Sequence, residues 1–232
     1  MKEIKKVIHN KKSILIISAH PDDETIGCGG TIAKHISEGD LVYALSFTDG
    51  VGSRGNVPDY ESAAITRENA SDAAADILGF YWVSKGNFPD NMLDTIPLLD
   101  LAKHIEKVKM EVNPDIIYTH SSADLNIDHR RVHEASLIAF RAQPSETWQE
   151  IRAYEVASST EWGIRPFSPN LFVKIDDFID KKKEALICYL AEMRDMPHPR
   201  SVASIESINR VRGSQAGFHY SEAFEVVKSR SL

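Results

Sequence analysis

The sequence predicts an α/β fold, a mostly parallel sheet with helices on both faces, and three observations support this. Short apolar, β-branched runs recur along the 232 residues, helical patterns separate them, and the runs are apolar at consecutive positions. Continuously apolar strands are typical of parallel sheets that are covered on both faces. Strands that alternate with helices, joined by right-handed crossovers, form a doubly wound sandwich.

The first third of the chain supplies the clearest elements. Ser13–Ala19 (SILIISA) predicts a buried strand, Glu24–Glu38 a helix that a glycine ends, and Leu41–Phe47 a second strand. Thr48–Asp59 is rich in Gly, Asp, Asn and Pro and therefore predicts a loop. Tyr60–Leu78 follows as a long Ala-rich helix, again with a glycine directly after it.

The remaining elements continue the alternation. Strands are expected at 80–83, 115–120, 152–157 and 171–175, and helices at 98–112, 130–141 and 177–193, with one more helical stretch in the tail. A chain of this length fits one domain. We expect it to span residues 1–232, with 151–232 as a C-terminal elaboration.

Composition narrows the classes of function. Lys and Arg total 27 against 34 Asp and Glu, and this net charge of −7 argues against nucleic acid as a partner. Two cysteines are too few for a disulfide scaffold or a multi-cysteine zinc module. No segment approaches the ~20 apolar residues of a membrane span, and the basic N-terminus lacks the apolar core of a signal peptide. We therefore expect a cytoplasmic protein without a membrane span.

Polar residues gather where the first strand ends, and ligands of such sheets bind beyond the carboxyl ends of strands. The segment AHPDDE contains His20, Asp22, Asp23 and Glu24. Acidic residues also favour helix N-termini. Three adjacent carboxylates repel one another, however, and a bound cation would relieve that repulsion. This cluster therefore predicts a metal site.

A second cluster, DLNIDHR, follows the strand at 115–120 and places His129 at the start of the next helix. Catalytic zinc commonly has three protein ligands and one position for water. His20, Asp23 and His129 supply that number from two strand ends, which leaves Asp22 to deprotonate the water. Two imidazoles and a carboxylate suit Zn²⁺ and, as the alternative metal, Fe²⁺.

Further candidates lie near the same edge of the predicted sheet. His120 ends a strand there, and His198 lies in a Pro-flanked loop that can reach over a site. Arg54, Arg67 and Arg130 lie in or near the region. They can clamp a phosphate or carboxylate of a substrate, or they can be solvated surface charges.

AHPDDE and DLNIDHR together resemble the LmbE-like, or PIG-L, family of zinc-dependent N-deacetylases. The resemblance covers most of the chain, from the first strand to the RGSQAG…EAF tail. It implies a Rossmann-like α/β fold, in which a single deacetylase domain holds zinc through His20, Asp23 and His129. It also implies that Asp22 is the general base and that Glu24 supports the ligands without binding the metal.

The resemblance also implies a substrate class. The family's substrates are mostly N-acetylated amino sugars on lipid, nucleotide or thiol carriers, so a small N-acetyl sugar is the expected partner. Arg67 matches a substrate-binding arginine, and Asp90 matches an acidic residue that holds sugar hydroxyls. Asp49 and Arg54, after the second strand, are further candidates for substrate contacts. Family members are often assembled, which makes a homo-oligomer an open expectation.

One departure from the family concerns the proton donor. Many members carry HPDH where this chain has NIDH, beginning at Asn126, and their first His, oriented by the Asp (here Asp128), is thought to stabilise the oxyanion or protonate the leaving amine. Asn126 can donate a hydrogen bond but cannot act as a general acid. His120, His198 or a proton returned by Asp22 could fill that role, and the sequence leaves the choice open.

The sequence therefore predicts a zinc-dependent hydrolase that removes the acetyl group from an N-acetylated amino sugar, free or linked to a nucleotide or lipid. A metal-dependent amidase for a small non-sugar N-acyl compound would use the same ligands and stays open. A metal-free nucleotide-binding module also stays open, in which the acidic cluster only caps a helix.

Overall fold

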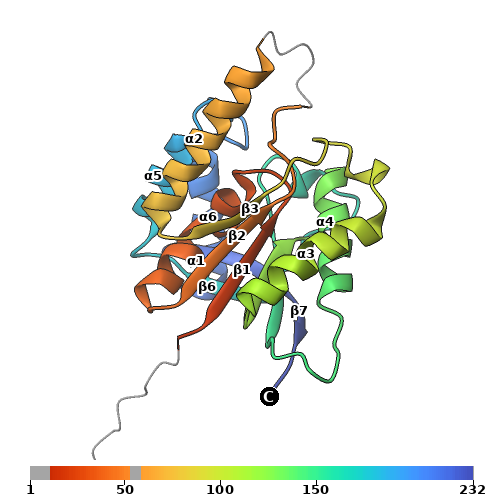
Figure 1. Cartoon of the computed structure of the whole chain (residues 1–232). Helices are drawn as coiled ribbons and strands as arrows, with labels where there is room; N and C mark the ends of the chain where they lie inside the picture. Colours follow the sequence, from red (N-terminus) through yellow and green to blue (C-terminus); the bar gives the residue numbers. More distant parts are fainter. Residues whose placement is uncertain (1–10, 53–58, 232) are drawn as a thin grey trace, which may run out of the picture.

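A computed structural model describes residues 11–52 and 59–231, so the candidate Arg54 lies outside the described residues. Seven strands form one sheet in the order β3-β2-β1-β4-β5-β7-β6 (Figure 1). The strands are β1 Ser13–Ser18, β2 Leu41–Ser46, β3 Tyr81–Lys85, β4 Ile116–His120, β5 Glu150–Tyr154, β6 Leu171–Lys174 and β7 Ser221–Ser229. The α-helices are α1 Asp23–Ser37, α2 Tyr60–Leu78, α3 Leu98–Val112, α4 Ile127–Ala139, α5 Ile179–Cys188 and α6 Val202–Ala216. The predicted α/β fold is confirmed.

The central strand β1 is apolar at consecutive positions because both of its faces are buried. Ile14 and Ile16 join the core formed with α1, α2, α5 and α6, whereas Leu15 and Ile17 join the core formed with α3 and α4. Figure 1 shows α3 and α4 on one side of the sheet and α1, α2 and α5 on the other. Side chains of a strand point alternately to opposite faces, so a two-sided core requires an unbroken apolar run.

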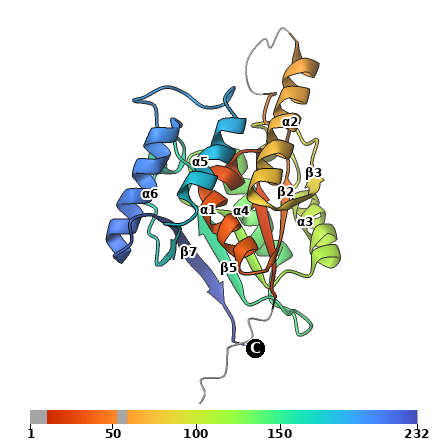
Figure 2. The ribbon, with the colours of Figure 1, turned by 90° about the vertical axis from the view of Figure 1, so that its left-hand side faces the viewer.

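The C-terminal part completes the same sheet with two strands, of which only β7 runs opposite to the others. β1 to β5 pair in parallel, while β7 runs antiparallel between β5 and β6. In Figure 2, α6 lies beside α5 and the chain then returns through β7. The sequence pattern predicts the helical stretch but misses β7, because Glu222, Glu225 and Lys228 interrupt its apolar residues.

A buried ion pair between α5 and β7 is hydrogen-bonded to the backbone of the first helix. Lys182 Nζ lies 2.6 Å from Glu222 Oε1, and both side chains are almost fully buried. Glu222 also accepts hydrogen bonds from the N–H groups of Gly30 and Thr31 in α1. A Cβ atom at Gly30 would lie 2.7 Å from a side-chain carbon of Ile175, so only glycine allows this approach. The glycines of α1 therefore serve close packing.

The helix after β4 begins earlier than the sequence predicts. α4 starts at Ile127, three residues before the expected Arg130, because Asn126 caps it. The Asn126 side-chain oxygen accepts a hydrogen bond from the N–H of Asp128 at 2.8 Å, which satisfies one free donor of the first turn. Among residues 11–52 and 59–231, none of the helices combines the length and the apolar character needed to cross a bilayer.

Candidate active site

The three predicted metal ligands converge where β1 and β4 end. These strands are parallel neighbours, so the segments that follow them meet at one edge of the sheet. Asp23 Oδ2 lies 3.1 Å from His20 Nδ1 and 3.4 Å from His129 Nε2, and the two imidazole nitrogens are 3.3 Å apart. All three side chains are buried. Three donor atoms thus face one point.

The chemistry of this donor set fits a divalent cation. Within the described part of the chain, Asp23 Oδ1 is buried and has no hydrogen-bond partner. Burial opposes the charged form of His129, but Asp23 and Asp124 outweigh it and raise the pKa of His129 to about 9. The field that attracts a proton to His129 also attracts a cation. Carboxylate and imidazole donors suit zinc or iron.

His20 also lies close to two other carboxylates. Its Nε2 is 3.1 Å from Asp90 Oδ1 and 3.4 Å from Asp128 Oδ2, which gives a second group of donor atoms. Asp128, however, accepts hydrogen bonds from the N–H groups of Asn91 and Leu93 through its two oxygens. Those bonds hold the 90–93 loop against the site, which favours the group containing Asp23 as the metal centre.

Asp124 orients His129 and carries a role that the sequence reasoning did not assign. Its Oδ2 lies 3.1 Å from His129 Nδ1, and the hydroxyls of Ser159 and Thr160 donate to its carboxylate. Burial raises the pKa of Asp124, but His129 and the hydroxyl donors outweigh burial and hold that pKa below its usual range. Metal-binding histidines typically have such a carboxylate behind them. The only sequence signal was its place within DLNIDHR.

His120 lies behind the ligands rather than in the cavity. Its ring stacks on His129 with 3.9 Å between centroids, and its Nε2 accepts a hydrogen bond from the N–H of Ala19 at 2.9 Å. Burial and the neighbouring His129 hold the pKa of His120 well below its usual value. A neutral, fully buried imidazole in this place supports His129 and the end of β1.

Asp22, the predicted base, is held by two arginines. Its Oδ1 lies 3.2 Å from Arg67 Nη2, and its Oδ2 lies 3.3 Å from Arg200 Nη1. The backbone of Asp22 has φ of +155°, a value that residues other than glycine rarely adopt. The N–H of Asp22 donates a hydrogen bond to the carboxylate of Glu24. Such strained residues cluster at functional sites. The arginines and Glu24 therefore fix the direction of this carboxylate.

Glu24 is fully buried next to Asp22. Its carboxylate also accepts hydrogen bonds from the hydroxyls of Thr25 and Tyr189. Burial and the neighbouring Asp22 raise the pKa of Glu24 to about 7. These contacts hold the carboxylate of Glu24 in place, and its role as a support of the metal ligands stays a prediction.

A polar cavity of about 270 Å³ opens beside the metal-ligand cluster. Five predicted residues line it: His20, Arg67, Asp90, Asn126 and His198. Glu192, Arg194 and Arg200 also line it, and sequence reasoning missed all three. The PHPRS loop was the one available signal, because His198 was expected to reach over a site.

Asp49, a predicted substrate contact, lies elsewhere. Its carboxylate accepts hydrogen bonds from the N–H of Val51 and the hydroxyl of Tyr60, and it does not line the catalytic cavity. Asn126 does line the cavity, and its side-chain N–H₂ donates to Asn91 Oδ1. Its amide nitrogen is the end of the side chain that can donate to a ligand, because the oxygen caps α4.

Relatives with this sequence pattern are deacetylases by name. The profile of the PIG-L family, described as GlcNAc-PI de-N-acetylase, matches residues 15–140. The chain is 30% identical to the uncharacterized deacetylase YaiS of Escherichia coli K12, over 77% of this chain and 90% of that protein. It is 27% identical to a probable N-acetyl-α-D-glucosaminyl L-malate deacetylase of Bacillus anthracis, over 79% and 82%.

Solved structures share the fold. The N,N′-diacetylchitobiose deacetylase of Pyrococcus horikoshii matches with a TM-score of 0.76 and 24% identity, over 94% of this chain and 84% of that one. A 4-carboxy-2-hydroxymuconate hydratase from Pseudomonas putida KT2440 matches with a TM-score of 0.74 and 24% identity, over 95% and 98%. The fold therefore serves more than one reaction. The family profile and the relatives identify this chain as a member of the PIG-L family of deacetylases.

Proposed function

We propose that this protein is a zinc-dependent hydrolase that removes the acetyl group from an N-acetylated amino sugar. The convergence of His20, Asp23 and His129 beside Asp22, at the edge of a polar cavity, carries the proposal. Relatives named for N-acetylglucosaminyl malate and diacetylchitobiose support an amino-sugar substrate. In the proposal His20, Asp23 and His129 hold the metal.

The metal would supply Lewis acidity, which polarises the acetyl carbonyl and makes a water molecule easier to deprotonate. Asp22 would accept the proton from that water, since Arg67 and Arg200 fix its carboxylate and the N–H of Asp22 is bound to Glu24. Asn126 would donate its amide N–H to the developing oxyanion, because its oxygen is already engaged with the first turn of α4.

Two groups, His198 and Asp22, remain as candidates for the proton donor to the leaving amine. The ring of His120 stacks on His129 and its Nε2 accepts a hydrogen bond from the N–H of Ala19, so His120 is assigned to positioning His129. His198 lines the cavity from an exposed loop, and its Nδ1 accepts a hydrogen bond from the N–H of Arg200. That bond leaves Nε2 of His198 free to carry a proton. Asp22 can instead return the proton that it accepted.

Sugar hydroxyls would be held by the remaining charged groups of the cavity. Asp90 Oδ1 lies near both His20 and the hydroxyl of Thr48, so its position is fixed before a substrate arrives. Arg67 pairs with Glu192 as well as with Asp22. A cavity lined by paired acids and bases suits a polyhydroxylated ligand better than an apolar one.

An acetate-release screen with zinc-loaded protein tests the proposal. We expect acetate from N-acetyl amino sugars, presented free, nucleotide-linked and lipid-linked, and none from N-acetyl amino acids. The Asp22→Asn variant should keep its metal and lose roughly 10²- to 10⁴-fold in rate, as expected for a missing general base. The matched control is Asp72→Asn, which only removes a surface pair with Lys85. Near-normal turnover by Asp22→Asn would rule out its assignment as the base.

The rival activities have different products. Release of acetate from non-sugar N-acyl compounds alone would favour the amidase. Because one structural neighbour is a hydratase, water addition to an unsaturated carboxylic acid is a further arm of the screen. The third rival is a metal-free nucleotide-binding module. It is excluded if the purified wild-type protein contains stoichiometric zinc and the His20→Ala variant does not.

A further inference from the structure

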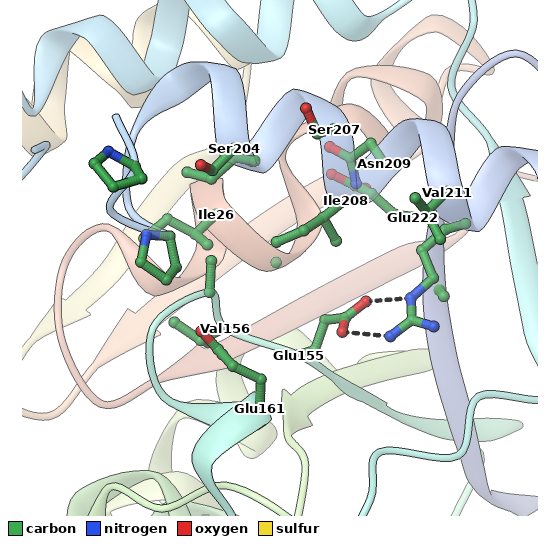
Figure 3. Close-up of a pocket in the computed structure, with 17 residues that line it drawn as sticks. Ile26, Glu155, Val156, Glu161, Ser204, Ser207, Ile208, Asn209, Val211 and Glu222 are labelled. Atoms are coloured by element: carbon green, nitrogen blue, oxygen red, sulfur yellow. Dashed lines mark hydrogen bonds and ion pairs between the residues drawn. The ribbon is translucent and has the colours of Figure 1, made fainter. Parts of the chain in front are cut away.

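A second cavity, of about 490 Å³, lies between α6 and the chain that follows β5. We call it the α6 groove. Figure 3 shows Ile208 of α6, Ile26 of α1 and Val156 around this space. Ala157 and Ile205 add further apolar surface. None of these residues is assigned to the metal centre or to the polar cavity.

The charged side chains around the α6 groove are already paired within the protein. Arg212 donates two hydrogen bonds of 2.7 Å to the two oxygens of Glu155, as the dashed lines of Figure 3 show. Glu161 accepts hydrogen bonds from two backbone N–H groups in its own turn. Glu222 is bound to Lys182. The groove therefore offers apolar surface and little charge for recognising an ion.

One polar atom of the lining differs from the others. Asn209 is buried and donates to the carbonyl of Ser221, while its Oδ1 has no hydrogen-bond partner in the described residues. A single acceptor can receive one hydrogen bond from a ligand hydroxyl or amide. It cannot replace the several contacts that a bound sugar or phosphate needs. Largely apolar walls with a small number of placed polar groups are typical of sites for small ligands.

The α6 groove shares two walls with the polar cavity beside His20, which is the catalytic cavity of the proposed function. Ala157 lines the groove, whereas the next residue, Ser158, lines the catalytic cavity. In the loop before α6, Pro197 and Pro199 line the groove, whereas His198 lines the catalytic cavity. In both segments, neighbouring residues therefore line different cavities. The α6 groove thus lies directly beside the catalytic cavity.

We infer that the α6 groove binds an apolar substituent of the substrate, a hydrocarbon chain or aryl group attached to the amino sugar held in the catalytic cavity. The inference rests on the proposed function for the sugar part alone. The paired charges leave no free counter-ion for an ionic carrier, and the shared walls place an occupant of the groove next to the reaction site.

Kinetics with two synthetic glycosides test this assignment. The octyl glycoside of N-acetylglucosamine should show at least a roughly tenfold higher kcat/KM than the methyl glycoside, since each buried methylene contributes several-fold. Val211 lines the groove and is 57% exposed, so Val211→Glu places a charge there without burying it deeply. Ser207→Trp fills the groove from an exposed position of α6. Both variants should remove most of the octyl advantage.

Ile187→Glu is the matched control, since Ile187 is 51% exposed on α5 and lines neither cavity. It should retain the wild-type ratio of the two glycosides. An equal kcat/KM for octyl and methyl glycosides in the wild type would overturn the inference. So would an octyl advantage that survives both groove variants.

A binding measurement separates this inference from the proposed function. Calorimetry with octyl glucoside, which has no acetamide, below its critical micelle concentration should show binding to the wild type and Ile187→Glu, and at least several-fold weaker binding to Val211→Glu. This result holds whether or not any glycoside is deacetylated. Absent or unchanged binding contradicts the groove assignment. A shift of sedimentation coefficient in Val211→Glu, with unchanged binding, would show instead that a second copy of the chain covers the groove.

Discussion

The candidate active site, which comprises the predicted metal ligands and the polar cavity beside them, has two halves with different construction. The strand-end half contains His20, Asp23 and His129, which are buried and lie in the segments that come after β1 and β4. The C-terminal arm, residues 189–201, contributes Glu192, Arg194, His198 and Arg200 from a segment between α5 and α6. The sheet fixes the first half, whereas ion pairs across the cavity hold the second. The candidate metal ligands thus lie in the loop after β1 and in the first turns of α1 and α4, whereas the other half comes from a loop.

Removing a ligand of the strand-end half should have the largest effect. We expect His129→Ala to lose its bound metal and to reduce acetate release to background, because two remaining ligands hold zinc poorly. Metal analysis of the purified protein checks this directly. His104→Ala is the control, since His104 lies on α3 and contacts Ser84 instead of the site. Full metal content in His129→Ala would transfer the ligand role to another residue.

The second-largest effect is expected from Asp124, whose carboxylate contacts the proposed ligand His129. Asp124→Asn removes the charge that orients His129 Nδ1, and it should weaken metal binding roughly 10- to 100-fold, the usual cost at such supporting positions. A competition titration with a zinc chelator measures the change. An unaltered affinity would show that Ser159 and Thr160 hold the site without this carboxylate.

The Arg200→Gln variant tests whether the C-terminal arm affects catalysis without affecting metal binding. It removes the contact with Asp22 Oδ2, which should lower kcat/KM roughly tenfold while metal content stays at the wild-type level. Arg194→Gln should have a smaller effect, because the Arg194 guanidinium bonds to backbone carbonyls of its own loop. Loss of metal in Arg200→Gln would show that the arm also holds the metal centre together.

The smallest effect is on stability. Asn126→Ala removes the cap of α4 and should cost about 1 kcal/mol of unfolding free energy. Asn126→Ser keeps a capping oxygen and should recover most of that loss. Urea denaturation of the three proteins measures the difference. Equal midpoints for all three would mean that the hydrogen bond to the Asp128 N–H contributes nothing to stability.

The two halves also differ in what sequence reasoning could find. His20, Asp23 and His129 belong to two short motifs at strand ends, and the parallel sheet brings such ends together whatever the loops do. Arg200 meets Asp22 across 178 residues of chain, so no local pattern links them. Asp124 lay within a recognised motif, but its partners Ser159 and Thr160 come from beyond β5.

Strand β7 was not predicted for a similar reason, because its polar residues have partners far away in the sequence. β7 carries Glu222, which is buried, and a buried carboxylate within a strand looks polar until its partner is known. That partner is Lys182 on α5, 40 residues earlier in the chain. The helices α2 and α3, in contrast, end at local signals, Gly79 and Asn113, which is why the predicted ranges 60–78 and 98–112 agree with both helices at both ends.

The antiparallel strand has a consequence for the order in which the protein assembles. β6 pairs with β7 and is the outermost strand, so its connection to the rest of the sheet runs through residues 221–229. A ribosome releases those residues after all the others that form the sheet. The first five strands can pair during synthesis, whereas β6 must wait for its bridging neighbour. During synthesis, therefore, β6 can join the sheet, and Lys182 can pair with Glu222, only after residues 221–229 have been made.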